Sequence, residues 1–121
     1  MKMKAGKGGV GNSSDIEEME MEGGARIRWL ITHRNGAPNF SMRLISIPEG
    51  KKTPFHSHNY EHEIFIIEGM VKATIDDRVE EAKNGDFIFI PPNAYHGMAA
   101  ETDTRLICIV PVDVARQMLG N

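Results

Sequence analysis

The segment His56–Glu68, which reads H-S-H-N-Y-E-H-E-I-F-I-I-E, carries three of the five histidines in the chain. His56 and His58 are two positions apart, and in an extended strand such side chains project to the same face, close enough to share one metal ion. His62 follows a polar stretch that can bend the chain, and it opens the apolar run 64–67. The segment therefore predicts a strand that begins beside a cluster of three imidazoles.

Around this segment, the chain consists of short runs rich in branched and aromatic residues, separated by turn residues. These runs predict nine strands, at residues 26–32, 40–47, 53–57, 64–68, 71–75, 78–82, 86–90, 95–100 and 104–111. Only the tail, residues 112–119, could be helical. Many strands and one terminal helix indicate an all-β fold, either a closed β-barrel or a jelly roll.

A chain of 121 residues is long enough for one domain. Glycines are frequent before Asn12, which favours a flexible segment at the start, whereas the strand-like pattern begins at Arg26. We therefore expect a flexible N-terminal arm over residues 1–24 and a single barrel over residues 25–121.

The composition argues against several classes of partner. The net charge is −3 and the lysines and arginines are scattered, so nothing resembles a nucleic-acid-binding stripe. No apolar run approaches the roughly 20 residues of a membrane-spanning helix, and the basic start Met1–Lys4 leads into glycines. The single cysteine, Cys108, lies in an apolar strand, which favours core packing over a reactive thiol. We expect a cytoplasmic protein that binds neither nucleic acid nor membranes.

Several of the expected strands are apolar on both faces. Phe65 and Ile67 alternate with two isoleucines, and Phe87 and Phe89 do the same in another run. A barrel wall that faces water should alternate polar and apolar residues, so the second apolar face needs a cover. We expect a homodimer packed through one sheet; the alternative is that the N-terminal segment folds over that face.

A fourth histidine, His96, ends a second patterned stretch, Gly85–His96, which reads G-D-F-I-F-I-P-P-N-A-Y-H. In a barrel, a strand that ends at prolines and re-enters the sheet at Tyr95 could place His96 opposite the other three imidazoles. Spacing alone leaves that placement open.

The two stretches together resemble the two cupin motifs. The first is Gly50, five residues, His56-x-His58, three residues, His62, six residues and Gly69; the second is Gly85, five residues, Pro91-x-Asn93, two residues and His96. The resemblance covers Phe40–Pro111, and it implies a cupin-type jelly-roll β-barrel.

The sequence departs from the usual cupin pattern at one position, because typical cupins have a glutamate where His62 stands. It is more similar to small single-domain cupins with H-x-H-x-x-E-H-E-x-F, whose manganese-binding members use four histidines. The resemblance therefore implies four metal ligands: His56, His58, His62 and His96. Glu61 and Glu63 remain competitors, since a change of one residue in the loop after His58 would let Glu63 replace His62. His33 lies in a remote turn-like segment, and we expect it at the surface.

Four neutral imidazoles would leave a divalent ion with its full charge, which makes the ion more electrophilic and harder to oxidise. Imidazole suits zinc, copper, iron and nickel, and the resemblance adds manganese. We expect one divalent transition metal per chain, with manganese or iron favoured and zinc, nickel or copper possible. Four ligands on one side of an octahedral ion would leave two neighbouring positions open, which is typical of a catalytic site.

The expected function is that of an oxidoreductase, similar to a dioxygenase, that activates dioxygen or peroxide towards a small organic substrate. Tyr95, beside His96, is the candidate donor of a proton or hydrogen bond to a bound oxygen species. One alternative is a redox-neutral isomerase or lyase that uses the ion as a Lewis acid, with Tyr95 or Arg43 as the polar partner. Another is a module that binds or senses a small molecule through the metal without turnover.

Overall fold

The computed structural model describes residues 3–121 and contains two β-sheets and a C-terminal helix. The elements are β1 (Met19–Glu20), β2 (Arg26–Ile31), β3 (Phe40–Ile47), β4 (His62–Glu68), β5 (Met70–Ile75), β6 (Arg78–Lys83), β7 (Phe87–Ile90), β8 (His96–Ala100), β9 (Thr104–Pro111) and α1 (Val112–Leu119), with two single 3-10 turns at Ser13–Asp15 and His33–Asn35. The six-stranded sheet has the order β1-β2-β3-β9-β4-β7, and the three-stranded sheet has the order β6-β5-β8. This arrangement is a jelly-roll barrel, as the sequence predicts.

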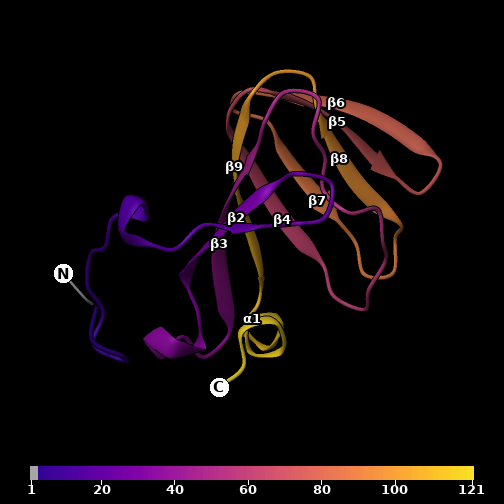
Figure 1. Cartoon of the computed structure of the whole chain (residues 1–121). Coiled ribbons are helices and arrows are strands. Elements are labelled where there is room, and N and C mark those ends of the chain that lie inside the picture. The colour runs from indigo at the N-terminus through magenta and orange to yellow at the C-terminus, as the bar shows by residue number, and fades with distance from the viewer. Residues whose placement is uncertain (1–2) are drawn as a thin grey trace.

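The core lies between the two sheets, because alternate residues of each strand point inward. Ile66, Val71 and Leu106, from three different strands, are completely buried. Figure 1 shows β5, β6 and β8 together in one part of the molecule, with α1 at the opposite end near the C-terminus. The interior between the sheets is therefore available to side chains from both.

The expected strand at residues 53–57 is absent as a continuous strand. Only isolated bridges form there, from Lys52 to Ala99 and from His56 to His96. Pro54 lies between these two bridges and has no N–H to donate to a ladder. The other eight expected strands and the helix at 112–119 are present, with ends that shift by at most two residues.

Part of the segment that we expected to be a flexible arm belongs to the sheet. β1 pairs with β2, with Met19 opposite Ile27, and Gly24 forms a bridge with Lys52. Upstream of β1, Arg28 of β2 donates to the carbonyl of Ser13, and the N–H of Gly6 donates to the carbonyl of Asn35. The described N-terminal segment thus lies against β2 and against the turn at His33–Asn35.

The outer face of β4 and β7 stays uncovered by the described residues. Phe65, Phe87 and Phe89 have 48%, 81% and 56% of their surface exposed. Phe65 lies directly opposite Phe87 in the pairing of β4 with β7. The second apolar face expected from the sequence is therefore real, and the N-terminal segment does not account for it.

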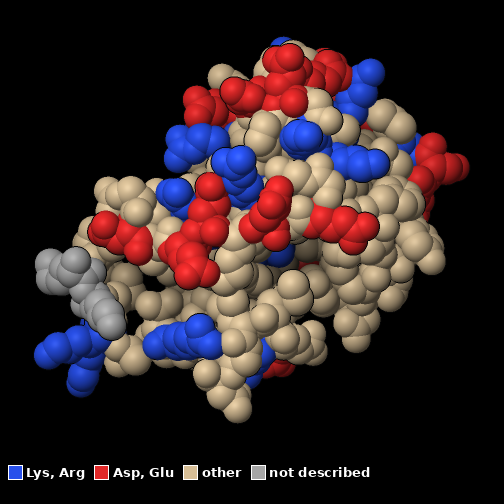
Figure 2. Space-filling model, viewed as in Figure 1, with Lys and Arg blue, Asp and Glu red and all other residues tan. Residues whose placement is uncertain are grey.

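Charged side chains of both signs are interspersed on the face shown in Figure 2, without a continuous basic stripe on that face. The helix of residues 112–119 is too short to cross a bilayer, and no other helix in residues 3–121 is long and apolar enough to do so.

Candidate metal centre

Four histidines from separate parts of the sequence meet between the two sheets. His62 is the first residue of β4 in the six-stranded sheet, and His96 is the first residue of β8 in the three-stranded sheet. His56 and His58 lie on the segment that leads into β4. The backbones of His56 and His96 exchange two hydrogen bonds, of 3.0 and 2.9 Å, which fix the two segments side by side.

The spacing of the four rings suits a single ion. One candidate ligand atom from each ring lies within 4.8 Å of those of the other three. Five of the ring pairs have centroids 4.7 to 5.0 Å apart. The Nε2 atoms of His62 and His58 are 2.8 Å apart. Adjacent nitrogens bound to one ion at about 2.1 Å would lie about 3 Å apart, so one ion could reach both atoms with little movement of the rings.

Two of the rings are held with their free nitrogen directed at the cluster. Nδ1 of His58 lies 2.9 Å from the carbonyl of Tyr60, and Nδ1 of His96 lies 2.9 Å from the carbonyl of Ala94. Because a carbonyl only accepts, each Nδ1 carries the proton and each Nε2 carries the lone pair. Nε2 of His96 is buried without any hydrogen-bond partner among the described residues. A buried nitrogen without a partner is rare in proteins, and a metal ion would satisfy it.

All four imidazoles are held in the neutral form. Burial is the main cause that lowers the pKa of each ring, and the nearby Arg43 charge lowers it further in every case. The effect is largest at His62, whose pKa falls to about 2. A metal ion would therefore not have to displace a proton from a charged imidazolium near neutral pH.

Behind His62 lies a buried pair of polar side chains. The Nη2 atom of Arg43 is 3.1 Å from Nδ1 of His62 and 2.8 Å from Sγ of Cys108. The guanidinium also lies over the ring of Trp29, at 5.3 Å from its centroid, and only 7% of Arg43 is exposed. None of the ion pairs found within residues 3–121 involves Arg43. From the sequence we considered Arg43 only as a polar partner for Lewis-acid chemistry. Its position against His62 depends on the register between β3 and β9, in which Arg43 pairs with Cys108.

Tyr95, the expected proton donor, is not part of the cluster. Its side chain is 55% exposed and its ring stacks on Phe55, with 6.0 Å between centroids. His96, the next residue, is only 5% exposed. Neighbouring residues of an extended backbone point to opposite faces, so the same geometry that buries His96 turns Tyr95 away from it.

Tyr60 is the aromatic residue that does contact the site. Its ring lies flat on His58, with 3.7 Å between centroids and an interplanar angle of 6°. It also approaches His62 edge-on at 5.6 Å. Burial raises the pKa of the Tyr60 hydroxyl, which therefore stays protonated. In the sequence, the position of Tyr60 between His58 and His62 was the feature that could have indicated this contact.

The two competing carboxylates do not join the cluster. Glu63 follows His62 in β4 and is exposed, whereas His62 is buried. Glu61 and Glu63 both line a cavity of about 230 Å³ with Phe40 and Ile109 on the outer side of the sheet. His33 is also remote from the four rings, because its Nε2 contacts the carbonyl of Gly120 at 2.7 Å. Of the candidate ligands, the structure brings together only the four histidines.

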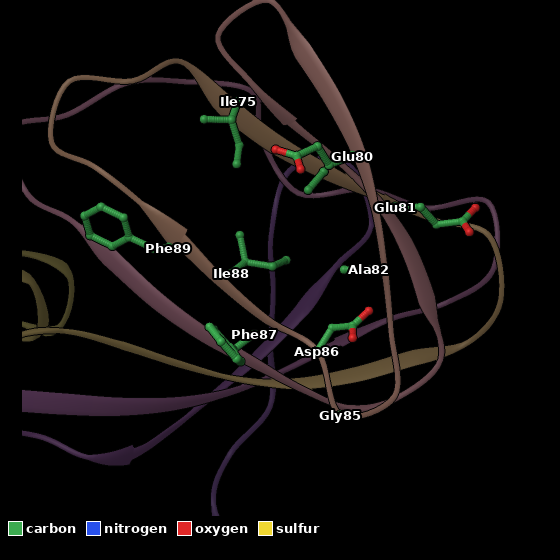
Figure 3. A pocket seen from close by; sticks show the side chains of 10 residues that line it. Ile75, Glu80, Glu81, Ala82, Gly85, Asp86, Phe87, Ile88 and Phe89 are labelled. Carbon is green, nitrogen blue, oxygen red and sulfur yellow. The ribbon is translucent and has the colours of Figure 1, made fainter.

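A larger cavity, of about 390 Å³, lies between the edge strands β6 and β7 and is separate from the histidines. Figure 3 shows Ile75 and Ile88 and the carboxylates of Glu80 and Asp86 among its lining. None of the four histidines lines this cavity. The histidine cluster is therefore not part of the wall of this cavity.

Comparison with known proteins places this cluster in a family. The chain is similar to the polyketide cyclase RemF from Streptomyces resistomycificus, with 27% identity over 86% of this chain and 79% of that one and a TM-score of 0.76. It is 31% identical to a cupin 2 domain-containing protein from Halorhodospira halophila, over 78% of this chain and 69% of that one, with a TM-score of 0.71. A predicted oxalate decarboxylase from Thermotoga maritima shares the fold, with 21% identity over 84% of this chain and 97% of that one and a TM-score of 0.72.

Comparison of the sequence alone also identifies relatives and a family. An uncharacterized protein of Methanocaldococcus jannaschii is 43% identical over 57 residues, which are 46% of this chain and 46% of that protein, so the chain spans less than half of that relative. The family model for the cupin domain matches residues 43–112, a range that includes all four clustered histidines. Because this match spans more than half of the sequence, the chain belongs to the cupin family.

Proposed function

We propose that this cupin is a metal-dependent enzyme that holds one divalent transition metal on His56, His58, His62 and His96, with manganese or iron favoured over zinc, nickel or copper. The observation that carries the proposal is the buried, unpartnered Nε2 of His96, which faces three other imidazoles within ligand distance. A site of imidazoles alone accepts several divalent metals, so the preference for manganese and iron rests on the chemistry proposed below.

The favoured reaction is an oxidation of a small organic substrate. A redox-active ion on the four histidines would supply electrons to dioxygen or peroxide beside that substrate. His56 is exposed, whereas His62 and His96 are buried, so a small molecule can reach the cluster from the His56 side. The Tyr60 ring covers one face of His58 and excludes water there. The carbonyls of Tyr60 and Ala94 fix two of the rings, which keeps the site rigid during turnover.

A second candidate is redox-neutral chemistry in which the ion acts as a Lewis acid. The buried Arg43 guanidinium adds positive charge behind a site that has no carboxylate ligand. Positive charge disfavours the loss of an electron from the metal and favours polarisation of a substrate oxygen. The similarity to a protein named as a polyketide cyclase agrees with this alternative.

The first experiment tests access to the metal without knowledge of the substrate. Protein loaded with ferrous iron in the absence of oxygen is exposed to nitric oxide, a dioxygen analogue. We expect the electron paramagnetic resonance signal of an iron nitrosyl. If iron is bound but no nitrosyl forms, then the ion has no position open to dioxygen and the oxidase proposal fails.

A second experiment separates the classes of function. Oxygen or peroxide consumption is measured for the manganese, iron and zinc forms with a panel of small aromatic and unsaturated compounds. We expect consumption with manganese or iron and none with zinc. Equal conversion by the zinc form without oxygen uptake would identify Lewis-acid chemistry. Metal-dependent binding of a compound without conversion by any form would identify a binding module.

A further inference from the structure

The hydrogen bonds behind His62 form a chain that runs in one direction. A guanidinium only donates, so Arg43 donates to Nδ1 of His62 at 3.1 Å. An imidazole that accepts at Nδ1 is neutral and carries its one proton on Nε2. With Nδ1 as the acceptor, that proton lies on Nε2 and is donated to Nε2 of His58 at 2.8 Å. His58 in turn donates from Nδ1 to the carbonyl of Tyr60.

This arrangement distinguishes His62 from His58 and His96. The latter two donate from Nδ1 to a carbonyl, so their Nε2 lone pairs face the cluster before any metal arrives. When His62 accepts from Arg43, its proton lies on Nε2, the atom that faces the other ligands. An imidazole nitrogen that carries a proton cannot bind a metal ion, so His62 must move its proton to Nδ1 before it can act as a ligand.

Moving the proton to Nδ1 creates a conflict with Arg43, because two donors would then face each other at 3.1 Å. Cys108 offers a solution. Its Sγ lies 3.2 Å from Nδ1 of His62 and 2.8 Å from Nη2 of Arg43, and a sulfur can accept a hydrogen bond from either. Cys108 is only 1% exposed, so its sulfur lies buried against these two partners.

We propose that Arg43 and Cys108 form a tautomer switch behind His62, in which Arg43 favours the ring form that cannot bind metal and Cys108 accepts from the form that can. Both are positioning residues, since they act on the ion through His62. His62 is then the ligand that joins the ion last and leaves it first, and the site alternates between three and four histidines. This inference rests on the proposed metal site and adds a controlled coordination position to it.

The most direct test uses the unmodified protein. The ¹⁵N chemical shifts of the histidine ring nitrogens show which nitrogen carries the proton. In metal-free protein near pH 7 we expect His62 with its proton on Nε2, and His58 and His96 with theirs on Nδ1. After addition of zinc, which is diamagnetic, we expect His62 with its proton on Nδ1. A proton on Nδ1 of His62 already in the metal-free protein would overturn the proposal.

Variants give a second test. The switch predicts that zinc affinity changes in opposite directions in the Arg43 and Cys108 variants, whereas a purely structural role predicts weaker binding in both. Cys108→Ala removes the acceptor and should weaken zinc affinity by about 10- to 100-fold, the range seen when groups behind a ligand are changed. Cys108→Ser keeps an acceptor and should recover most of that loss. Arg43→Met removes the competing donor and should tighten zinc binding severalfold. Weaker binding in both Arg43→Met and Cys108→Ala would overturn the proposal.

Two controls complete the design. Val110→Ala shortens an equally buried inward residue two positions along β9 and should leave zinc affinity unchanged. If Arg43→Met does not fold, Arg43→Gln replaces it, because an amide oxygen can accept from Nδ1 and should also tighten binding. If the wild-type protein binds no metal at all, the proposed function fails, whereas the ring-nitrogen shifts of the metal-free protein still decide between the two tautomers.

Discussion

His96 and His62 are similarly buried, at 5% and 6% exposed, but their rings reach the cluster in different states. The His96 ring is fixed by the Ala94 carbonyl with its lone pair free, whereas the His62 ring is engaged by Arg43 on the opposite nitrogen. A ligand that is already oriented contributes more to affinity than one that must first exchange a hydrogen bond.

We therefore expect His96→Ala to lose more metal affinity than His62→Ala, with both weaker than wild type by more than about tenfold. Isothermal titration with manganese and zinc measures this, and His33→Ala, outside the cluster, serves as the matched control. Unchanged affinity in His62→Ala would remove His62 from the ligand set and restore Glu63 as the candidate.

The lowered pKa of the buried histidines also predicts how stability depends on pH. Below the ordinary value of 6.5 the unfolded chain takes up protons that the folded protein does not, so the free energy of unfolding falls as pH falls. For His62, with a folded pKa of about 2, the loss between pH 7 and pH 5 is about 2 kcal/mol. Urea unfolding of metal-free protein at the two pH values measures it. His62→Gln should reduce the difference, and an unchanged difference would show that His62 does not titrate in this way.

At the level of single residues, the four histidines could be predicted because their spacing is local to two motifs. Arg43 and Cys108 were not predicted as contacts of His62, since they come from β3 and β9 and meet only through the register between these strands. Tyr95 lies outside the histidine cluster, because its neighbour His96 points inward and alternation sends Tyr95 outward.

At the level of elements, Gly69 joins β4 of one sheet to β5 of the other and has a positive φ of 106°. A Cβ at this position would meet the hydroxyl and backbone of Thr104 and the carbonyl of Asp103. Gly85 also has a positive φ, of 85°, but a Cβ there would meet nothing within 4 Å. Substitution would therefore strain the backbone at both positions, but only at Gly69 would the new side chain also collide with neighbouring atoms.

We expect Gly85→Ala to destabilise the fold by about 1–2 kcal/mol from backbone strain alone. Gly69→Ala should cost clearly more, because Thr104 or the β4–β5 connection must also move. Chemical unfolding of both variants gives the comparison. Equal losses in the free energy of unfolding would show that the chain around Thr104 moves away from the new Cβ without an energetic cost.

Most strands were predictable because their apolar runs are bounded by turn residues. The segment 53–57 was not, since its composition is strand-like but Pro54 interrupts the ladder between two bridges. β1 was also missed; its two residues, Met19 and Glu20, carry no periodic signal and pair only because β2 offers an edge. In both cases, pairing with a segment distant in the sequence determined whether a strand formed.

For the whole molecule, we propose that a second copy of the chain covers the outer face of β4 and β7. Phe65, Phe87 and Phe89 form an exposed apolar patch there. The Glu68–Arg105 ion pair lies at the C-terminal end of β4 and supplies both signs of charge. A two-fold axis brings the same patch of two protomers together, which suits an apolar surface bordered by paired charges.

Light scattering at micromolar concentration should therefore give the mass of a dimer, and Phe87→Glu should give a monomer that stays folded, because Phe87 is 81% exposed. Val79→Glu, at an exposed apolar residue on β6 in the other sheet, is the matched control and should leave the dimer intact. A monomeric wild-type protein would contradict the proposal.

The central claim is that four histidines bind one metal ion in this barrel. It is tested most directly by a crystal structure of protein loaded with manganese, with anomalous diffraction measured at the manganese absorption edge. We expect one anomalous peak per chain, within ligand distance of His56, His58, His62 and His96 and of no carboxylate. A peak bound to Glu61 or Glu63, or no peak at the cluster in protein that contains manganese, would contradict it.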